Sequence, residues 1–362
     1  MSQKVIYFVT SLQSGGIENY LLRFLRDNHQ KFDQIVVFCK SGKAGQLESE
    51  YKSLTNVSVI RQRIGFFNPL VFLKLLKYFK INKFDAICDF TGNFAGQIVF
   101  LSKCAGIRKR IVFYRGSSDR FSSSRLKLIF NNWVKSLVFK YATDILSNSQ
   151  AALNYFFNNK WETDSRFEVI YNGVNSSDFL KHKNNLRKEF NIPADAFVVG
   201  HTGRFDVAKN HQTILAVAEQ LVFENPKFYF ILCGNKVKIS LEKLLVEKGL
   251  NERILVFENR ADIPQFLNTM DCYYFPSVTE GQPNALIEAM IMNIPIVASD
   301  IEPIKETVPY AALEYLVRPL DIKAAKEKIL TIYNERGNQN FQNWAIQHFE
   351  SESLFQKFFN RF

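Results

Sequence analysis

The sequence predicts an α/β protein in which two doubly wound parallel sheets form two domains. The first observation is length, because 362 residues exceed the roughly 250 to 300 residues at which a single hydrophobic core usually stops growing. The second is a regular alternation of short apolar runs with helix-like segments, which is typical of parallel sheets covered on both faces. The third is a polar stretch near residues 172–196, after which the alternation starts again.

The strand-like runs place the elements and the domain boundaries. Before the polar stretch they read KVIYFVT, QIVVFC, VSVIRQ, DAICDF, RIVFYR, DILSNS and FEVIYN. After it they read AFVVGHTG, FYFILCG, ILVFEN, CYYFPS, PIVASD and YLVRP. We therefore predict a first domain over residues 1–171 and a second over residues 172–339. The segment from about residue 340 to 362 is helix-like with no predicted strand after it, so we expect it to pack back onto the first domain.

Composition and segment lengths indicate a cytoplasmic protein. The apolar run after Lys4 is about six residues long, which fits a buried strand better than a signal peptide. No run approaches the roughly 18 apolar residues of a membrane span. The five cysteines are scattered and mostly lie in strand-like runs, which favours buried thiols over disulfides or a metal site. The five histidines lack the spacing of zinc ligands.

The charge is concentrated in the first half of the chain. Residues 1–170 carry 25 Lys and Arg against 12 Asp and Glu, a net charge of +13, whereas the remainder carries −2 of the total of +11. The first half is therefore expected to face an anionic partner. Nucleic acid, anionic lipid and a phosphorylated substrate all meet this description, and charge alone does not choose among them.

The first candidate motif is SLQSGGIENYLLRFL, which follows the first predicted strand. Gly15 and Gly16 open a helix, and small residues there let backbone amides and the positive helix end approach an anion closely. The motif lacks the GxGxxG pattern of dinucleotide-binding folds. A tight strand-to-helix turn without a ligand explains the glycine pair equally well.

The second motif is GHTGRFDVAKNHQTIL, in which Arg204 and Lys209 flank a short loop between a predicted strand and a helix. Ligands of doubly wound sheets bind beyond the carboxyl ends of the strands. Two cations at such an end, beside a helix start, suit a diphosphate. Solvated surface charges are the alternative interpretation.

The third motif is FPSVTEGQPNALIEAM. Pro283 is well placed as the first residue of a helix, so Glu280 lies in the loop before it and Glu288 lies about five residues inside it, roughly 7 to 8 Å along the axis. Two carboxylates at this spacing can hold two parts of one extended ligand, while free helix amides receive a negative group between them. A nucleotide sugar has this layout. The alternative interpretation is that Glu280 is a partner of the helix dipole and Glu288 is a surface residue of the helix.

At these residues the sequence resembles the family 4 retaining glycosyltransferases of the GT-B fold, and the resemblance covers nearly the whole chain. SGGIENYLLRFL, ILSNS, VIYNGVNSSDF, GRFDVAKN and FPSVTEGQPNALIEAMIMNIPIVASDI are similar to the landmarks of that family, in the same order. The resemblance implies two Rossmann-like domains with the active site between them and a final helix that crosses back to the first. It also implies sugar transfer from a nucleotide diphosphate with retention of configuration and without a metal or other cofactor.

The resemblance also implies a role for each candidate residue. Glu280 would bind donor-sugar hydroxyls near the reacting carbon, and Glu288 the ribose hydroxyls. Arg204 and Lys209 would neutralise the leaving diphosphate, as two fixed cations can in place of a divalent ion. The donor site would be completed by Gly15, Gly16, Gly281, Gln282, Asn284 and Ala285, with backbone amides from Gly16, Asn284 and Ala285. Arg260, in the segment FENRAD, would lie near the base.

One segment departs from the family pattern. Many members carry a histidine after the strand that corresponds to RIVFYR, close to the donor sugar, whereas this chain reads VFYRGSSDR. Tyr114 and Arg115 are therefore candidates for an acceptor or donor-sugar contact. Arg115 as a structural salt-bridge partner is the alternative.

Two basic segments raise the question of a membrane surface. In NPLVFLKLLKYFKINKF lysines are interleaved with apolar residues, and SRLKLIFNNWVKSLVFKYA carries an apolar stripe from Leu126 to Tyr141 at helical spacing. Such stripes usually face the core. The alternative is a basic surface on an anionic inner membrane, where a lipid-linked acceptor would be found. Nucleic acid fits less well, because no recognition motif accompanies the basic residues.

We therefore predict a metal-independent retaining glycosyltransferase of the hexosyltransferase type, peripheral on the inner membrane face, that uses a nucleotide-sugar donor, UDP-linked rather than GDP-linked. The acceptor would be a surface glycan or a lipid-linked oligosaccharide. One alternative is a GT-B nucleotide-sugar 2-epimerase, which needs further acid/base residues near the sugar. The other is a non-catalytic nucleotide-sugar or glycan-binding module, which the joint presence of Arg204, Lys209, Glu280 and Glu288 argues against.

Overall fold

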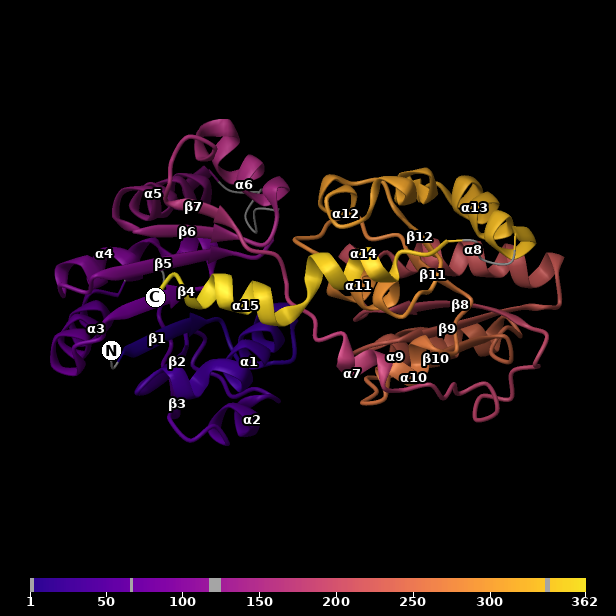
Figure 1. The fold of residues 1–362 in the computed structure, drawn as a ribbon, viewed down its shortest axis with the longest axis horizontal. Coiled ribbons are helices and arrows are strands. Elements are labelled where there is room, and N and C mark those ends of the chain that lie inside the picture. Colours follow the sequence, from indigo (N-terminus) through magenta and orange to yellow (C-terminus); the bar gives the residue numbers. More distant parts are fainter. Residues whose placement is uncertain (1–2, 66–67, 117–124, 336–338) are drawn as a thin grey trace. The chain divides into compact units, whose positions relative to one another are not determined.

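The computed structural model describes residues 3–65, 68–116, 125–335 and 339–362. The chain forms two compact units, each with its own parallel sheet (Figure 1). Unit 1 comprises residues 1–173 and 353–362, and unit 2 comprises residues 174–352. The predicted α/β class with two doubly wound sheets is confirmed. The first boundary between the units lies after residue 173, two residues later than predicted.

Unit 1 contains a seven-stranded sheet in the order β3-β2-β1-β4-β5-β6-β7, with every neighbouring pair parallel. The strands are β1 Lys4–Val9, β2 Gln34–Cys39, β3 Val57–Arg61, β4 Ala86–Asp89, β5 Lys109–Tyr114, β6 Asp144–Ser147 and β7 Phe167–Val169. Each coincides with a predicted run. The strand order reverses between β1 and β4, so the carboxyl end of β1 lies at a topological switch point, where ligands of such sheets bind.

Helices cover both faces of this sheet. They are α1 Gly16–Asn28, α2 Glu48–Lys52, α3 Pro69–Asn82, α4 Gly96–Cys104, α5 Arg125–Tyr141 and α6 Gln150–Phe157, with short 3-10 turns η1 His29–Lys31, η2 Gly92–Ala95 and η3 Asn158–Trp161. Successive β1 side chains alternate between two cores, because side chains of a strand point to opposite faces. Tyr7 packs with α1 and α2 in one core, and Phe8 packs with α3 and α4 in the other.

The carboxyl-terminal helix α15, Ser351–Phe359, completes the first of these cores. Phe358 is fully buried, and its ring centroid lies 4.7 Å from that of Phe24 of α1. The predicted return of residues 340–362 to the first domain is therefore correct only for residues 353–362. The preceding helix α14, Gln342–Phe349, packs instead on α11, Asn284–Ile291, because its buried residues and the Gln342 side chain, which donates to the Ile291 carbonyl at 2.7 Å, face that helix.

Unit 2 contains a six-stranded parallel sheet in the order β10-β9-β8-β11-β12-β13. The strands are β8 Phe197–Thr202, β9 Phe228–Cys233, β10 Ile254–Phe257, β11 Cys272–Phe275, β12 Ile296–Ser299 and β13 Leu316–Val317. The other elements are α7 Ser177–Leu180, η4 Val207–Lys209, α8 His211–Glu224, α9 Val237–Glu247, α10 Ile263–Leu267, α12 Glu302–Lys305, η5 Tyr310–Tyr315 and α13 Ile322–Glu335. The switch point of this sheet lies between β8 and β11, the two strands that precede the second and third motifs.

Within the described residues, no helix is both long and apolar enough to cross a membrane.

Candidate functional site

The loop after β8 is held by tight backbone packing. Gly203 follows the strand, and its amide donates to the Cys233 carbonyl of β9 at 2.8 Å. A Cβ on Gly203 would lie 2.8 Å from Nε2 of His201, and a Cβ on Gly234 would lie 2.1 Å from the Gly203 carbonyl oxygen. Gly234 also has a φ of +157°. Both positions therefore require glycine, and the two loops approach each other closely at the carboxyl ends of β8 and β9.

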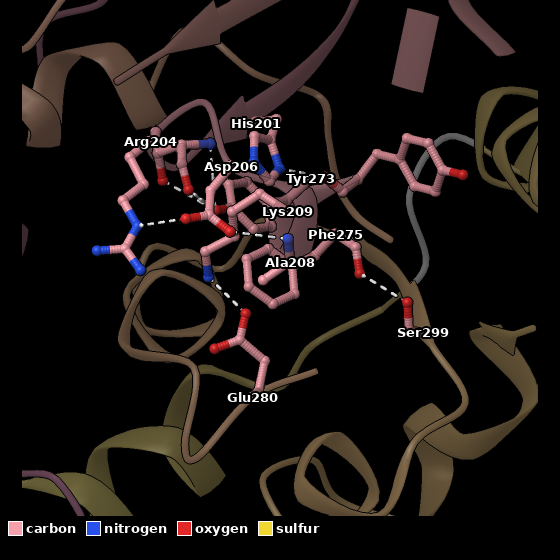
Figure 2. A network of polar contacts seen from close by, with 11 residues as sticks. His201, Arg204, Asp206, Ala208, Lys209, Tyr273, Phe275, Glu280 and Ser299 are labelled. Carbon is pink, nitrogen blue, oxygen red and sulfur yellow. Dashed lines mark hydrogen bonds and ion pairs between the residues drawn. The ribbon is translucent and has the colours of Figure 1, made fainter. Parts of the chain in front are cut away.

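Lys209 and Glu280 form the central contact of the site. Nζ of Lys209 lies 2.5 Å from Oε1 of Glu280, and their side chains are 19% and 12% exposed. The Lys209 ammonium also lies 4.7 Å from the ring centroid of Phe275, the last residue of β11. Figure 2 shows Lys209 reaching from the β8 loop toward Glu280. The structure thus brings together two residues that are 71 positions apart in the sequence and that were predicted independently to bind the donor.

Arg204 lies on the outer side of the same loop. Its side chain is 62% exposed, and its Nε lies 3.4 Å from Oδ2 of Asp206 (Figure 2). Asp206 also accepts a hydrogen bond from the Ala208 amide at 2.9 Å, which caps η4. An exposed ion pair of this kind contributes roughly 0 to 1 kcal/mol, so Arg204 can be redirected at little cost.

The second glutamate lies on α11. Glu288 is the fifth residue of that helix, as predicted. Burial raises the pKa of the Tyr273 hydroxyl, and the charges of Glu288 and Glu280 raise it further, so both carboxylates lie near this β11 tyrosine. Pro283 is the residue that caps α11, with an extended ψ of 96°, and not its first helical residue as predicted. The helix therefore begins at Asn284, one position later.

The remaining donor candidates of unit 2 surround this helix start. Gly281 and Gln282 lie in the loop between Glu280 and α11, and Gln282 is buried. Asn284 and Ala285 are half-buried residues of the first turn. The Leu286 and Ile287 amides donate to the Pro283 carbonyl at 3.2 Å, and the positive end of the helix dipole lies at this first turn.

The guanidinium of Arg260 is engaged with neighbouring residues of unit 2. It donates to Asp262 at 2.6 Å and lies 3.1 Å from Glu189, and hydrogen bonding to Asp262 raises its pKa. Its Cζ lies 5.2 Å and 5.5 Å from the ring centroids of Phe190 and Phe257. The guanidinium is thus used to fix the loop after β10, because two carboxylates and two rings occupy it. The contact of Arg260 with the base stays a prediction.

In unit 1, the predicted glycine pair lies at the start of α1. Gly15 caps the helix with an extended backbone and no side-chain cap, and Gly16 is its first residue. A Cβ on Gly16 would meet no heavy atom within 4 Å. Packing therefore does not demand glycine at position 16, and the open space beside it is accessible to a ligand.

Tyr114 and Arg115, at the end of β5, have different environments. Tyr114 is 1% exposed, and its hydroxyl donates to Oδ1 of Asn93 at 2.8 Å, so its side chain belongs to the core. Arg115 stacks on Tyr20 of α1, with Cζ 3.8 Å from the ring centroid. Burial lowers the pKa of Arg115 to about 10, so it is still charged at neutral pH. The residues that follow in VFYRGSSDR, from 117 on, lie outside the described part of the chain.

A cavity of about 690 Å³ lies at the other end of the unit 2 sheet. Its lining includes Asp195, Met270 and Asn293, which precede or flank the amino ends of the strands. Ligands of doubly wound sheets bind at the carboxyl ends, where Lys209 and Glu280 lie. We therefore assign no role in donor binding to this cavity.

Comparison with known proteins agrees with the fold. The family described as Glycosyltransferase Family 4 matches residues 14–178, and the family described as Glycosyl transferases group 1 matches residues 182–347. The chain is a glycosyltransferase of the GT-B fold. Among solved structures, HepE of Anabaena in complex with UDP-glucose superposes with a TM-score of 0.80 at 22% identity, covering 99% of this chain and 98% of that one. Sucrose-phosphate synthase of Thermosynechococcus elongatus superposes with a TM-score of 0.76 at 17% identity, with the same coverage.

Curated relatives of this glycosyltransferase cover most of its length. The capsular polysaccharide biosynthesis glycosyltransferase CapH of Staphylococcus aureus is 29% identical over 313 residues, which are 85% of this chain and 84% of CapH. A Campylobacter jejuni transferase that adds N-acetylgalactosamine to a diphospho-undecaprenol-linked sugar is 24% identical over 310 residues, 82% of this chain and 81% of that protein.

A pair of buried histidines that no sequence motif predicted lies beside the Lys209 loop. The rings of His201 and His211 lie 5.2 Å apart, and both residues are at most 3% exposed. Burial lowers both pKa values, to about 4 for His211. Within the described residues no three His, Cys, Asp or Glu side chains are grouped as metal ligands. The histidines are ten positions apart on a strand and a helix, and no local pattern in the sequence predicts that they meet.

A second unpredicted cluster lies at the carboxyl ends of β2 and β4. Lys40 donates to Asp89 at 2.5 Å, to the Thr91 hydroxyl at 2.7 Å and to the Phe94 carbonyl at 3.1 Å. Burial lowers the pKa of Lys40. The cluster fixes the loop after β4 beside the switch point of unit 1. The sequence signal that could have predicted this cluster is the position of Lys40 and Asp89, each at the end of an apolar run.

Proposed function

We propose that this glycosyltransferase moves a sugar from a nucleotide diphosphate sugar, with UDP as the favoured carrier, to a surface glycan or a lipid-linked oligosaccharide. The observation that carries the proposal is the contact of Lys209 with Glu280, 2.5 Å apart in front of the α11 start. A cation and a carboxylate held together beside the start of a helix suit a ligand that has an anionic centre and hydroxyls.

The diphosphate would bind to Lys209, Arg204 and the first amides of α11. Lys209 is largely buried in its pair with Glu280, whereas Arg204 is 62% exposed and can swing inward. Charge-assisted hydrogen bonds of this kind are about twice as strong as neutral ones. Two cations that contact the leaving diphosphate can stabilise it in the way a divalent ion would, which supports a metal-independent reaction.

The two glutamates would bind the donor sugar and the ribose. Glu280 would accept hydrogen bonds from donor-sugar hydroxyls next to the reacting carbon, and Glu288 from the ribose. In the retaining reaction that we propose, the acceptor oxygen bonds to the anomeric carbon on the face from which the phosphate oxygen departs. The carbon–oxygen bond to the diphosphate breaks, and the acceptor proton passes to the leaving phosphate. The reaction thus needs no histidine beside Arg115.

The acceptor class is proposed from the relatives. CapH acts in capsular polysaccharide biosynthesis, and the Campylobacter jejuni transferase acts on a sugar linked to diphospho-undecaprenol. The first name describes a capsular polysaccharide, and the second describes a lipid-linked acceptor. We accordingly propose that this protein works in the cytoplasm at the inner face of a membrane, where a lipid-linked acceptor would be available.

Nucleotide-dependent thermal stabilisation tests the donor site. The purified protein would be heated with UDP, GDP, ADP and their common sugar conjugates, with EDTA present throughout. A ligand at about 100 times its dissociation constant stabilises the folded state by roughly 2.7 kcal/mol, so UDP should raise the midpoint clearly. Lys209→Met should bind UDP roughly 10- to 100-fold more weakly, because a hydrogen bond between charged groups is lost. Lys243→Met, on α9, whose side chain is 90% exposed, is the matched control. Failure of every nucleotide to stabilise the protein in EDTA would contradict the proposal.

A variant of Glu280 separates an enzyme from a binding module. Glu280→Gln keeps the size of the side chain but removes its charge, so UDP binding should persist while turnover of the sugar donor falls about 100-fold or more, as expected when the reacting group is misplaced. Hydrolysis or transfer would be followed by release of UDP. Glu242→Gln, on an exposed face of α9, should leave turnover unchanged. Equal turnover by the two variants would remove Glu280 from the reaction.

A further inference from the structure

The outer helices on one side of the unit 1 sheet contain no acidic residue. Helices α3, α4 and α5 comprise 14, 9 and 17 residues, and none of these is Asp or Glu. Helices α1 and α2, on the opposite side, carry Glu18, Asp27, Glu48 and Glu50. The cations of the acid-free side are Lys74, Lys77, Lys80, Lys103, Arg125, Lys127, Lys135 and Lys140. We call the outward surface of these three helices the α3–α5 face.

Large apolar side chains are exposed among these cations. On α3, Leu70, Leu73 and Ile81 are 71%, 63% and 65% exposed. On α5, Leu126, Ile129 and Trp133 are 79%, 65% and 43% exposed. The predicted core-facing stripe of α5 is thus only partly correct, because Val134 and Val138 are buried while the first turns of the stripe face solvent.

The face is continuous and has a defined direction. Helix α4 packs against both α3 and α5, and the inner sides of α3 and α5 share one core through residues such as Phe79 and Val138 (Figure 1). Each of the three helices runs antiparallel to the strands it connects, so the amino ends of α3 and α5 lie toward the carboxyl ends of the strands. Leu70 and Leu126 are at those ends, which is where ligands of doubly wound sheets bind.

This combination of groups identifies the class of partner. Interleaved lysines and exposed Leu, Ile and Trp are the composition of helices that lie in a membrane interface, with apolar groups at the acyl boundary and cations among anionic headgroups. Nucleic acid would satisfy the lysines but not the exposed leucines. A second copy of the same face would bring eight cations against eight others, which repel one another.

We propose that the α3–α5 face docks on an anionic lipid surface. This deepens the proposed function, since it rests on an acceptor that is lipid-linked, and it assigns the contact to particular helices. The amino ends of α3 and α5 would enter the interface, so that the carboxyl end of the unit 1 sheet faces the membrane. Binding then requires both the lysines, for attraction to the headgroups, and the exposed apolar side chains, for insertion.

Sedimentation of the full chain with lipid vesicles tests the charged part of the face. The protein should bind vesicles of phosphatidylcholine mixed with phosphatidylglycerol, and bind vesicles of phosphatidylcholine alone far more weakly. Added salt should weaken the binding. The variant Lys74→Gln/Lys77→Gln/Lys80→Gln should partition on the order of 100-fold more weakly, given about 1 kcal/mol for each lysine near the surface. The control Lys238→Gln/Lys243→Gln/Lys248→Gln removes the same charge from α9 of unit 2.

Matched apolar variants test insertion. Leu126→Ser/Ile129→Ser should weaken binding by roughly 10-fold or more, and lowering the salt should not restore it, because the lost contribution is apolar burial. Ile239→Ser/Val246→Ser removes two exposed apolar side chains from α9, which are 80% and 57% exposed, and should bind like the wild type.

A spectroscopic readout locates the contact. Trp133 is one of three tryptophans in the chain; in a Trp161→Phe/Trp344→Phe background its fluorescence should be quenched by vesicles with brominated acyl chains.

The proposal is overturned if the lysine variant and its α9 control bind equally, if anionic vesicles do not bind the wild type, or if Trp133 is not quenched in bound protein. A dimer broken by Leu126→Ser/Ile129→Ser would instead assign the face to a second copy. Nucleotide stabilisation is measured without vesicles, so the two proposals fail separately. A protein that UDP stabilises but that does not bind vesicles refutes the α3–α5 face alone. A protein that binds vesicles but that UDP does not stabilise refutes the donor site.

Discussion

At the scale of single residues, His201 and His211 determine which groups carry charge near the Lys209 loop. Their rings lie 5.2 Å apart. Burial, followed by the neighbouring positive charges, lowers the pKa of each imidazole. Both are therefore neutral at neutral pH and do not repel Lys209. The positive charge of the loop is supplied by Lys209 and Arg204, which remain available for a diphosphate.

The depressed pKa of His211 makes stability depend on pH. An unfolded histidine titrates near 6.5, whereas His211 in the folded protein titrates at about 4. Between these values the unfolded chain binds the proton and the folded one does not, so stability is fully present above about 6.5 and is lost as the pH falls toward 4.

We therefore expect the wild type to lose about 2 kcal/mol more stability than His211→Gln when the pH falls from about 7 to about 5. Urea unfolding followed by fluorescence at the two pH values gives the difference, and comparison with the variant cancels the other titrating groups. His348→Gln, on the exposed side of α14, is a control that should behave like the wild type. Parallel pH profiles for His211→Gln and the wild type would show that the folded imidazole takes up a proton readily.

At the scale of elements, sequence patterns predicted strands well and neighbours poorly. Each predicted run contains a strand, because β-branched and aromatic residues are enriched in strands. The α5 stripe was a good predictor of a helix, but whether Leu126 and Ile129 meet another element depends on packing beyond the helix. Arg260 is a second example of partners that the sequence did not predict. Its position after a strand was predictable, but its ion pairs with Asp262 and Glu189 were not.

Helix α15 gives a prediction at this scale. Phe358 is fully buried, and its ring contacts those of Phe24, Phe90 and Phe113 from α1, β4–η2 and β5. Phe358→Ala should destabilise unit 1 by about 3 to 5 kcal/mol, the usual cost of truncating a buried phenylalanine. Phe223→Ala, whose ring on α8 is 74% exposed, should change stability by less than about 0.5 kcal/mol. Urea unfolding monitors both variants. A small effect of Phe358→Ala would mean that α15 is not required for the core of unit 1.

At the scale of the whole molecule, the charged residues predicted to bind the donor and the basic helices lie in different units. The charged donor candidates Arg204, Lys209, Glu280 and Glu288 all belong to unit 2, whereas the glycine pair and the acid-free helices belong to unit 1. The order of the motifs along the chain made this division predictable, because each motif follows a strand of one series. The contact of Lys209 with Glu280 was not predictable from spacing, since it depends on β8 and β11 being neighbours in the sheet.

This division predicts where a nucleotide will slow hydrogen exchange. UDP at about 100 times its dissociation constant should slow amide exchange by up to about 100-fold wherever exchange requires the bound state to open. We expect the slowing in residues 203–211 and in the first turn of α11, because these segments would hold the diphosphate. Helix α4 of unit 1 serves as an internal reference and should be unaffected. In Lys209→Met, UDP at the same concentration should protect both segments less, since one cation serves both. Protection confined to the lining of the cavity at the amino ends of the strands would place the nucleotide at the opposite end of the sheet and contradict the roles proposed for Lys209 and Glu280.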